Sequence, residues 1–187
     1  MTVTFDKRKK DFLGKGDKSS IGGWDKPILK LLDKLNKKKD YYTLSSCSGR
    51  IVVIRNVVKK VPNIFVFREH RIVKFTEVAK VFSDYRGKDG LVFKQEPCIL
   101  HVACRDLGAA RNLLKKALLA GWKNSGIIVI SDNRVIVDLR STEAISFPIH
   151  NCKNLLVDRD FLKFIVKEAN KRLLRSWDKI KKFEALV

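Results

Sequence analysis

The chain has 187 residues and a formal net charge of +20, with 40 Lys and Arg against 20 Asp and Glu. This length fits one domain with a substantial core, and the 45% hydrophobic content excludes a largely disordered chain. No apolar run reaches the roughly 18 residues that a membrane-spanning helix needs, and the N-terminus lacks the apolar core of a signal peptide. We therefore expect a single-domain cytoplasmic protein with no membrane partner.

The positive charge is spread evenly along the chain. Lys and Arg outnumber Asp and Glu by twelve to six in residues 1–40, by eighteen to nine in 41–152 and by ten to five in 153–187. A basic tail would indicate an appended electrostatic arm, whereas a uniformly basic globule indicates a polyanionic partner such as RNA. A Lys-rich thermophile surface is the alternative, although such surfaces usually balance Lys with Glu.

The cysteines do not suggest a metal site. Cys47, Cys98, Cys104 and Cys152 form no C-x-x-C pair, and we expect neither a disulfide framework nor bound metal.

The apolar periodicity predicts a mixture of helices and strands. Residues 6–25 are polar and contain glycines, which favours a basic, loosely structured arm over residues 1–25. Ile28, Leu31 and Leu35 then follow a helical spacing. The later patterns predict strands at 41–44, 51–58, 64–68, 91–93, 98–104, 127–131, 134–140, 144–149 and 155–157. They also predict three helices whose N-caps are Thr76, Asp106 and Asp158.

These elements indicate an α+β protein. We expect one compact domain with mixed or antiparallel sheets and flanking helices. A helix, a Ser-Gly pair and a hairpin occur twice, which suggests duplicated halves at about 26–90 and 98–187; coincidence is the alternative. No glycine-rich loop follows a buried strand, so a Rossmann-type methyltransferase is not expected.

Strand 98–104 has the most buried-looking pattern. In a pleat, Cys98, Leu100, Val102 and Cys104 share one face and His101 lies on the other. Burial of His101 in this apolar run would favour its neutral form, unless a carboxylate pairs with it.

The stretch Tyr41–Arg50 combines small polar residues with a glycine and an arginine. Gly49 can adopt a positive φ, successive main-chain N–H groups in such a turn can hold an anion, and Arg50 can add a bidentate fork. The alternative is an ordinary Ser-Gly turn between two buried elements.

Several motifs resemble those of the wybutosine-synthesis methyltransferase family, whose members methylate N-4 of the tricyclic base at position 37 of tRNA-Phe. The resemblance runs nearly end to end. Its main segments are Tyr42–Ile51 (YTLSSCSGRI), Phe65–His70 (FVFREH), Glu96–Arg105 (EPCILHVACR), Ala120–Ile127 (AGWKNSGI), Asp138–Ser141 (DLRS) and an N-terminal motif from Asp17 to Asp25. Two departures are Ile21, where the family usually has Lys, and Asn63–Phe65 (NIF), where the family's strand opens with a Gly-x-Trp-like sequence, so that Phe65 stands in place of the Trp.

The resemblance implies an enzyme that transfers a methyl group from S-adenosyl-L-methionine to tRNA-Phe, with contacts to the anticodon loop. The family lacks the usual methyltransferase fold. We assign cofactor binding to six small residues, although an anticodon-loop phosphate could occupy the first turn instead: Ser45, Ser46, Ser48, Gly49, Ser125 and Gly126. His70 and His101 are the candidate bases. The candidate tRNA contacts are Arg50, Arg105, Arg140, Asp17 and Trp24.

Two other functions remain open from the sequence. One is a non-catalytic RNA-binding module, which would bind no S-adenosylmethionine. The other is a small-molecule enzyme with an incidentally basic surface, whose ligand affinity would not fall steeply with salt.

Overall fold

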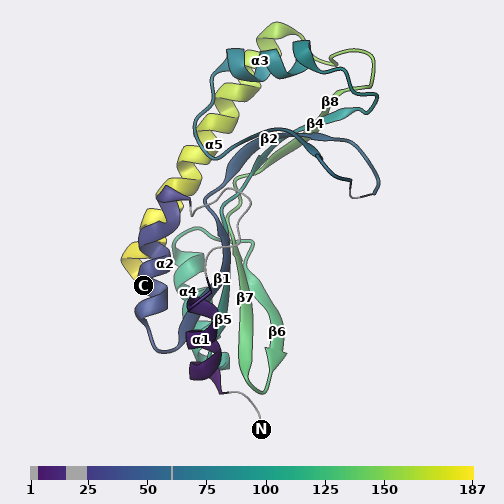
Figure 1. Ribbon diagram of the computed structural model, residues 1–187. Coiled ribbons are helices and arrows are strands. Elements are labelled where there is room, and N and C mark those ends of the chain that lie inside the picture. Colours follow the sequence, from purple (N-terminus) through teal and green to yellow (C-terminus); the bar gives the residue numbers. More distant parts are fainter. Residues whose placement is uncertain (1–3, 16–24, 60) are drawn as a thin grey trace. The chain divides into compact units, whose positions relative to one another are not determined.

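A computed structural model describes residues 4–15, 25–59 and 61–187 (Figure 1). Its contacts divide the chain into two compact units, each assembled from separated segments. The first unit comprises the described residues up to Ser48 together with Cys98–Thr142 and Ser176–Val187. The second comprises Gly49–Pro97 and Glu143–Arg175.

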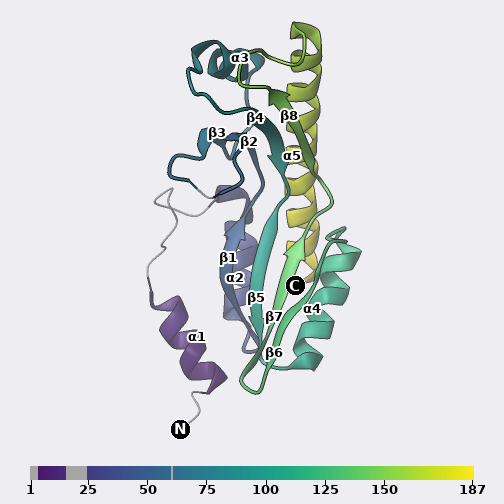
Figure 2. The same ribbon diagram turned by 90° about the vertical axis from the view of Figure 1, so that its right-hand side faces the viewer.

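The first unit contains a four-stranded antiparallel sheet in the order β1-β5-β7-β6, whose strands lie side by side in Figure 2. The strands are β1 (Tyr41–Cys47), β5 (Ile99–Cys104), β7 (Arg134–Arg140) and β6 (Gly126–Ser131). The helical elements are α1 (Phe5–Leu13), η1 (Lys26–Ile28), α2 (Leu29–Lys37), α4 (Leu107–Leu119) and the C-terminal part of α5 (Arg159–Leu186).

One face of this sheet carries the core. Leu100, Val102 and Cys104 of β5 pack there with residues from η1, α2, α4 and the end of α5. Trp122 is fully buried in this cluster, and its Nε1 donates a hydrogen bond of 3.1 Å to the Lys179 carbonyl. The predicted division of strand 98–104 into two faces is therefore confirmed.

The core cysteines are small hydrophobic residues. Burial raises the pKa of both the Cys98 and the Cys104 thiol to about 12, so both remain protonated at neutral pH.

The opposite face, which we call the outer face, is partly covered by α1. The sequence predicts a loose arm here, but residues 5–13 form a helix whose Thr4 Oγ1 accepts the Lys7 N–H at 3.4 Å. Phe5 and Phe12, two turns apart, contact the Tyr42 ring at centroid distances of 5.2 and 5.7 Å. This aromatic contact stabilises a helix whose charged sequence shows little periodicity.

The second unit contains another four-stranded antiparallel sheet, in the order β3-β2-β4-β8. Its strands are β3 (Phe65–Glu69), β2 (Arg50–Arg55), β4 (Leu91–Glu96) and β8 (Ile145–His150), and its helices are α3 (Phe75–Asp84) and the first part of α5. The Asn170 side chain joins α5 to the segment before α3, because it bonds both the N–H and the carbonyl of Val73 at 3.0 and 2.8 Å.

Two local predictions in this unit were wrong. Thr76 does not cap α3; the helix begins after Lys74, whose N–H donates to the Glu77 carboxylate at 2.6 Å. Residues 155–157 form no strand beyond a single bridge between Leu155 and His150.

The predicted α+β class is confirmed, with antiparallel sheets in both units. The proposed halves at 26–90 and 98–187 do not coincide with the units, because α2 packs on β1 whereas the β2–β3 hairpin belongs to the second sheet. The duplication stays a prediction. None of the helices in the described part of the chain combines the length and the apolar composition that a membrane-spanning segment needs.

Candidate active site

Four residues from four strands form a single row across the outer face of the first sheet. Ser45 of β1 pairs with His101 of β5, His101 pairs with Asp138 of β7, and Asp138 pairs with Gly126 of β6. A register shift between Thr43 and Ser45 brings Ser45 opposite His101. We call these four residues the outer row; three strand spacings make it about 14 Å long.

The side chains of the outer row contact one another. Ser45 Oγ lies 2.8 Å from His101 Nδ1, and His101 Nε2 lies 3.5 Å from Asp138 Oδ1. The other carboxylate oxygen, Asp138 Oδ2, accepts a hydrogen bond of 3.1 Å from Arg140.

His101 is less buried than its apolar neighbours suggest, because its side chain points away from the core and is 32% exposed. The carboxylate that pairs with His101 is that of Asp138, whose side chain is 18% exposed. Asp138 Oδ1 is buried and has no hydrogen-bond partner among the described residues, since 3.5 Å is too long for one.

Asp138 was not among the site residues predicted from the sequence. The alternation of β7 does place Asp138 and Arg140 on the polar face of the strand. The alternation does not give the pairing register of β5 and β7, and it is this register that places Asp138 opposite His101.

The predicted Ser-Gly turn is shorter than expected, because Ser45, Ser46 and Cys47 belong to β1. Gly49 adopts a φ of 99°, which agrees with the positive φ predicted for this glycine. Ser48 is fully buried, and its N–H donates a hydrogen bond of 2.8 Å to Asp25 Oδ2. This N–H, expected to help hold an external anion, is thus bound to a carboxylate of the chain itself.

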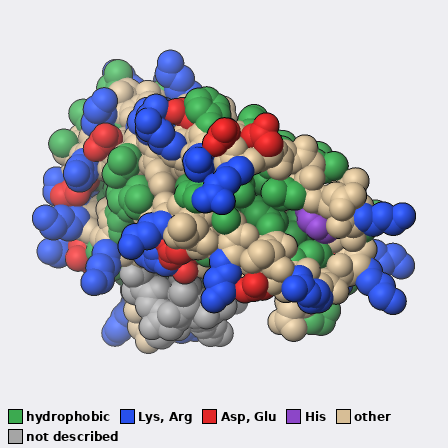
Figure 3. Space-filling view, turned by 90° about the horizontal axis from the view of Figure 1, so that it is seen from above, with side chains coloured by type: hydrophobic (Ala, Val, Ile, Leu, Met, Phe, Trp, Pro, Cys, Tyr) green, Lys and Arg blue, Asp and Glu red, His purple; other side chains and the backbone are tan. Residues whose placement is uncertain are grey.

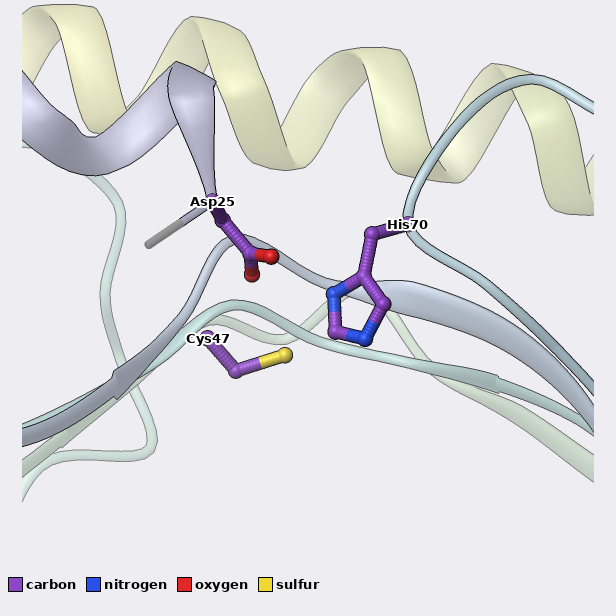
Figure 4. A group of neighbouring side chains, drawn as sticks. All are labelled: Asp25, Cys47 and His70. Carbon is purple, nitrogen blue, oxygen red and sulfur yellow. The ribbon is translucent and has the colours of Figure 1, made fainter. Parts of the chain in front are cut away.

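Figure 4 shows the Asp25 carboxylate and the Cys47 thiol at this end of β1, both in the first unit. The third labelled residue, His70, belongs to the second unit and follows β3.

The structure brings together only part of the predicted cofactor set. Ser45 and Gly126 belong to the outer row. Ser46 pairs with Leu100, so its side chain lies on the opposite face from Ser45. The Ser125 hydroxyl donates to the Trp122 carbonyl at 2.7 Å and accepts the Arg140 N–H at 3.0 Å, which indicates a structural role.

Gly126 leaves open space at one end of the row. A Cβ placed on this glycine would meet no atom within 4 Å.

The predicted tRNA contacts are in different surroundings. Arg105 pairs with Asp6 at 2.6 Å and Asp40 at 3.1 Å and stacks on the Phe5 ring, so it anchors α1. Arg140 is 45% exposed beside the outer row. Asp17 and Trp24 lie outside the described residues.

The second unit holds Arg50 at the start of β2. Its Nε bonds Glu96 at 2.5 Å, and its guanidinium lies 5.0 Å from the centre of the Phe65 ring. Arg68 contacts the same ring at 5.1 Å. Phe65, a departure from the family pattern, thus forms part of a cation–aromatic cluster.

Lys and Arg side chains are distributed around the face seen in Figure 3, and Asp and Glu are fewer. This distribution agrees with the even excess of basic residues along the sequence.

Comparison with known proteins identifies the family. The family model described as Methyltransferase TYW3 matches residues 7–187. The chain belongs to the TYW3 methyltransferase family. The resemblance inferred from the motifs is therefore confirmed.

Two archaeal relatives of this TYW3 chain are named as tRNA(Phe) 7-((3-amino-3-carboxypropyl)-4-demethylwyosine(37)-N(4))-methyltransferase. The relative from Archaeoglobus fulgidus is 38% identical, over 83% of this chain and 79% of its own length. The relative from Thermococcus sibiricus is 36% identical, over 96% of this chain and 92% of its own. The tRNA wybutosine-synthesizing protein 3 homolog of Xenopus laevis is 32% identical, over 92% of this chain and 70% of its own.

Solved structures share the fold of this family member. The PH1069 protein from Pyrococcus horikoshii matches with a TM-score of 0.86 and 32% identity, covering 97% of this chain and 93% of that one. A hypothetical protein from Aeropyrum pernix matches with a TM-score of 0.73 and 26% identity, covering 86% and 97%. From its family and relatives the chain is a tRNA methyltransferase, and its described residues form two antiparallel sheets instead of the parallel sheet of a Rossmann fold.

Proposed function

We propose that this chain methylates N-4 of the 4-demethylwyosine-type base at position 37 of tRNA-Phe, with S-adenosyl-L-methionine as the methyl donor. The observation that carries the proposal is the family match over residues 7–187, together with archaeal relatives of that name at 36–38% identity. The excess of basic residues agrees with a tRNA substrate.

The outer row is the part of the first unit that suits this chemistry best. It presents an exposed hydroxyl, an imidazole and a carboxylate on the rigid surface of a sheet. Because Gly126 adds no side chain at its end, the row would leave room there for a planar base or a nucleoside. Side chains held by a sheet can align two reactants closely, which is the main requirement of a displacement reaction.

S-adenosylmethionine, when bound, supplies an electrophilic methyl group. Gly126 provides the open space a bulky ligand needs, and Ser45 offers an exposed hydroxyl; these two residues of the predicted cofactor set would lie against it. Ser48 and Ser125 would hold the backbone around the site in place and would not contact the cofactor. The Ser48 N–H and the Ser125 hydroxyl already form hydrogen bonds within the protein.

The chain's own groups would bind the base and take its proton. Methylation of N-4 would release the hydrogen of this ring nitrogen, and a basic side chain of the protein would accept it as a proton. His101 is the base that we favour, because its ring is partly exposed and its contacts lie within one sheet. His70 stays the alternative, with Arg50 as a tRNA contact from the same unit. Arg140, beside the row, would meet a phosphate of the anticodon loop.

Methyl transfer tests the proposal directly. Purified protein is incubated with methyl-labelled S-adenosylmethionine and tRNA-Phe carrying the 4-demethyl tricycle, and the nucleoside products are separated. We expect label on N-4 of that base. The same tRNA with an unmodified guanosine at position 37 is the control. No transfer to the tricycle, or equal transfer to the control, would overturn the proposal.

A further inference from the structure

We infer that Ser45, His101 and Asp138 form a proton relay for the proposed methylation, in which Asp138 is a positioning residue for His101. The inference rests on the proposed function for its substrate. Its structural basis is the continuous line of contacts from an exposed hydroxyl, through an imidazole, to a largely buried carboxylate.

The contacts determine which ring nitrogen carries the proton. The Ser45 hydroxyl lies at hydrogen-bond distance from His101 Nδ1, and Asp138 Oδ1 faces Nε2. A carboxylate favours a proton on the nitrogen that faces it. Neutral His101 therefore carries its proton on Nε2, and Nδ1 accepts the Ser45 O–H.

The position of Asp138 allows its carboxylate to stabilise a positive charge on the His101 ring. Its Oδ2 is bound by Arg140, whereas the buried Oδ1 has no hydrogen-bond partner among the described residues. Buried carboxylate oxygens normally have a donor, and Nε2–H at 3.5 Å is the neighbouring one. A positive imidazolium would shorten this contact and be stabilised by it.

The proton leaves the substrate through Ser45. The N-4 hydrogen passes to Ser45 Oγ while the Ser45 hydroxyl proton passes to His101 Nδ1. The electron pair of the N–H bond remains on N-4 and forms the bond to the methyl carbon, and the pair of the broken carbon–sulfur bond stays with sulfur. The imidazolium then returns its proton to solvent, so each residue ends as it began.

The same arrangement predicts how an amide would act at position 138. In Asp138→Asn, the amide group can donate to Nε2 and thereby move the imidazole proton to Nδ1. Ser45 could then no longer pass its proton to the ring. We expect kcat to fall by about 10²-fold or more, as for loss of a general base, with little change in KM for the tRNA.

The direct test is the nitrogen-15 NMR spectrum of the His101 imidazole, at a pH where it is neutral, in the wild type and in Asp138→Asn. We expect the Nε2–H form in the wild type and the Nδ1–H form in the variant. Asp132→Asn, in the exposed turn between β6 and β7, is the matched control and should change neither the spectrum nor kcat.

Activity separates this inference from the proposed function. Ser45→Ala should lose activity like Asp138→Asn, and Ser45→Thr should recover part of it because a hydroxyl is restored. An unchanged His101 proton position in Asp138→Asn, or unchanged kcat in Asp138→Asn or Ser45→Ala, would overturn the relay. If the wild type transfers no methyl group, the proposed function fails, and the NMR spectra still show whether Asp138 controls His101.

Discussion

The main-chain N–H of Ser48 donates a hydrogen bond of 2.8 Å to the carboxylate of Asp25, 23 positions earlier in the chain. The Ser-Gly corner after β1 is thus partly occupied by a negative group of the protein. Asp25 immediately precedes η1, so this bond joins the start of a helical segment to the end of a strand.

This bond makes Asp25→Ala destabilising. Loss of the acceptor leaves a buried N–H without its partner, and we expect the free energy of unfolding to fall by about 1–3 kcal/mol. Denaturant unfolding measures it. Asp33→Ala, which removes an exposed carboxylate from α2, is the control and should have little effect. Equal stability of the two variants would contradict the role of Asp25.

Two glycines of the predicted site should respond differently to alanine. Gly49 has a φ of 99°, which an L side chain adopts only with strain, so Gly49→Ala should cost about 1–3 kcal/mol of unfolding free energy. Gly126 has open space around a built Cβ, so Gly126→Ala should fold with near wild-type stability.

For enzymatic activity we expect the opposite order, with the larger direct effect in Gly126→Ala. If a ligand lies against Gly126, a methyl group there should raise KM or lower kcat in a protein of unchanged stability. Calorimetry and methyl-transfer kinetics on the same two variants check both statements. A Gly126→Ala enzyme with wild-type kinetics would exclude close ligand approach at that end of the outer row.

The Glu77 carboxyl should make the stability of the second unit depend on pH. Hydrogen bonds from Arg71 and from the Lys74 N–H lower the pKa of its carboxyl from 4.5 to about 2. Because the folded pKa is the lower one, this group stabilises the fold above about pH 4.5, and its contribution is lost as the pH falls towards 2.

Carboxyl NMR titration of Glu77 measures this shift. Arg71→Ala should return the midpoint most of the way to the ordinary value, because the Arg71 side-chain hydrogen bond is the largest cause. A wild-type midpoint near 4.5 would show that the Arg71–Glu77 pair is not formed in solution.

Binding to tRNA should weaken steeply with salt. A basic surface that meets phosphates releases counterions, so the logarithm of affinity falls linearly with the logarithm of salt concentration. Arg140→Ala should reduce that slope by about one phosphate contact. Arg111→Ala, on α4 and therefore on the core side of the sheet, is the matched control. Equal slopes for both variants would remove Arg140 from the tRNA interface.

Local patterns in the sequence predicted most of the strands and the longer helices. The alternation in strand 98–104 gave the correct core face, and Asp106 was correctly expected to cap α4, where its carboxylate accepts the Ala109 N–H at 2.8 Å. Both features depend on residues close together in the chain, which is why spacing alone reveals them.

The remaining features depend on contacts between distant residues. α1 forms because Phe5 meets Tyr42, and the outer row forms because a register shift near Thr43 sets Ser45 opposite His101. The partner of His101, Asp138, is 37 positions away in sequence. No local pattern specifies such a register, so a sequence motif could name the residues of the site without showing which of them meet.

The discontinuous construction of the first unit also constrains its synthesis. Its core includes Ile180 and Phe183 near the end of α5, packed with residues from η1 and α2. The first sheet therefore cannot complete its hydrophobic packing until residues up to Phe183 have left the ribosome. During translation, the earlier strands of that sheet would therefore keep apolar surface uncovered until this part of α5 has emerged.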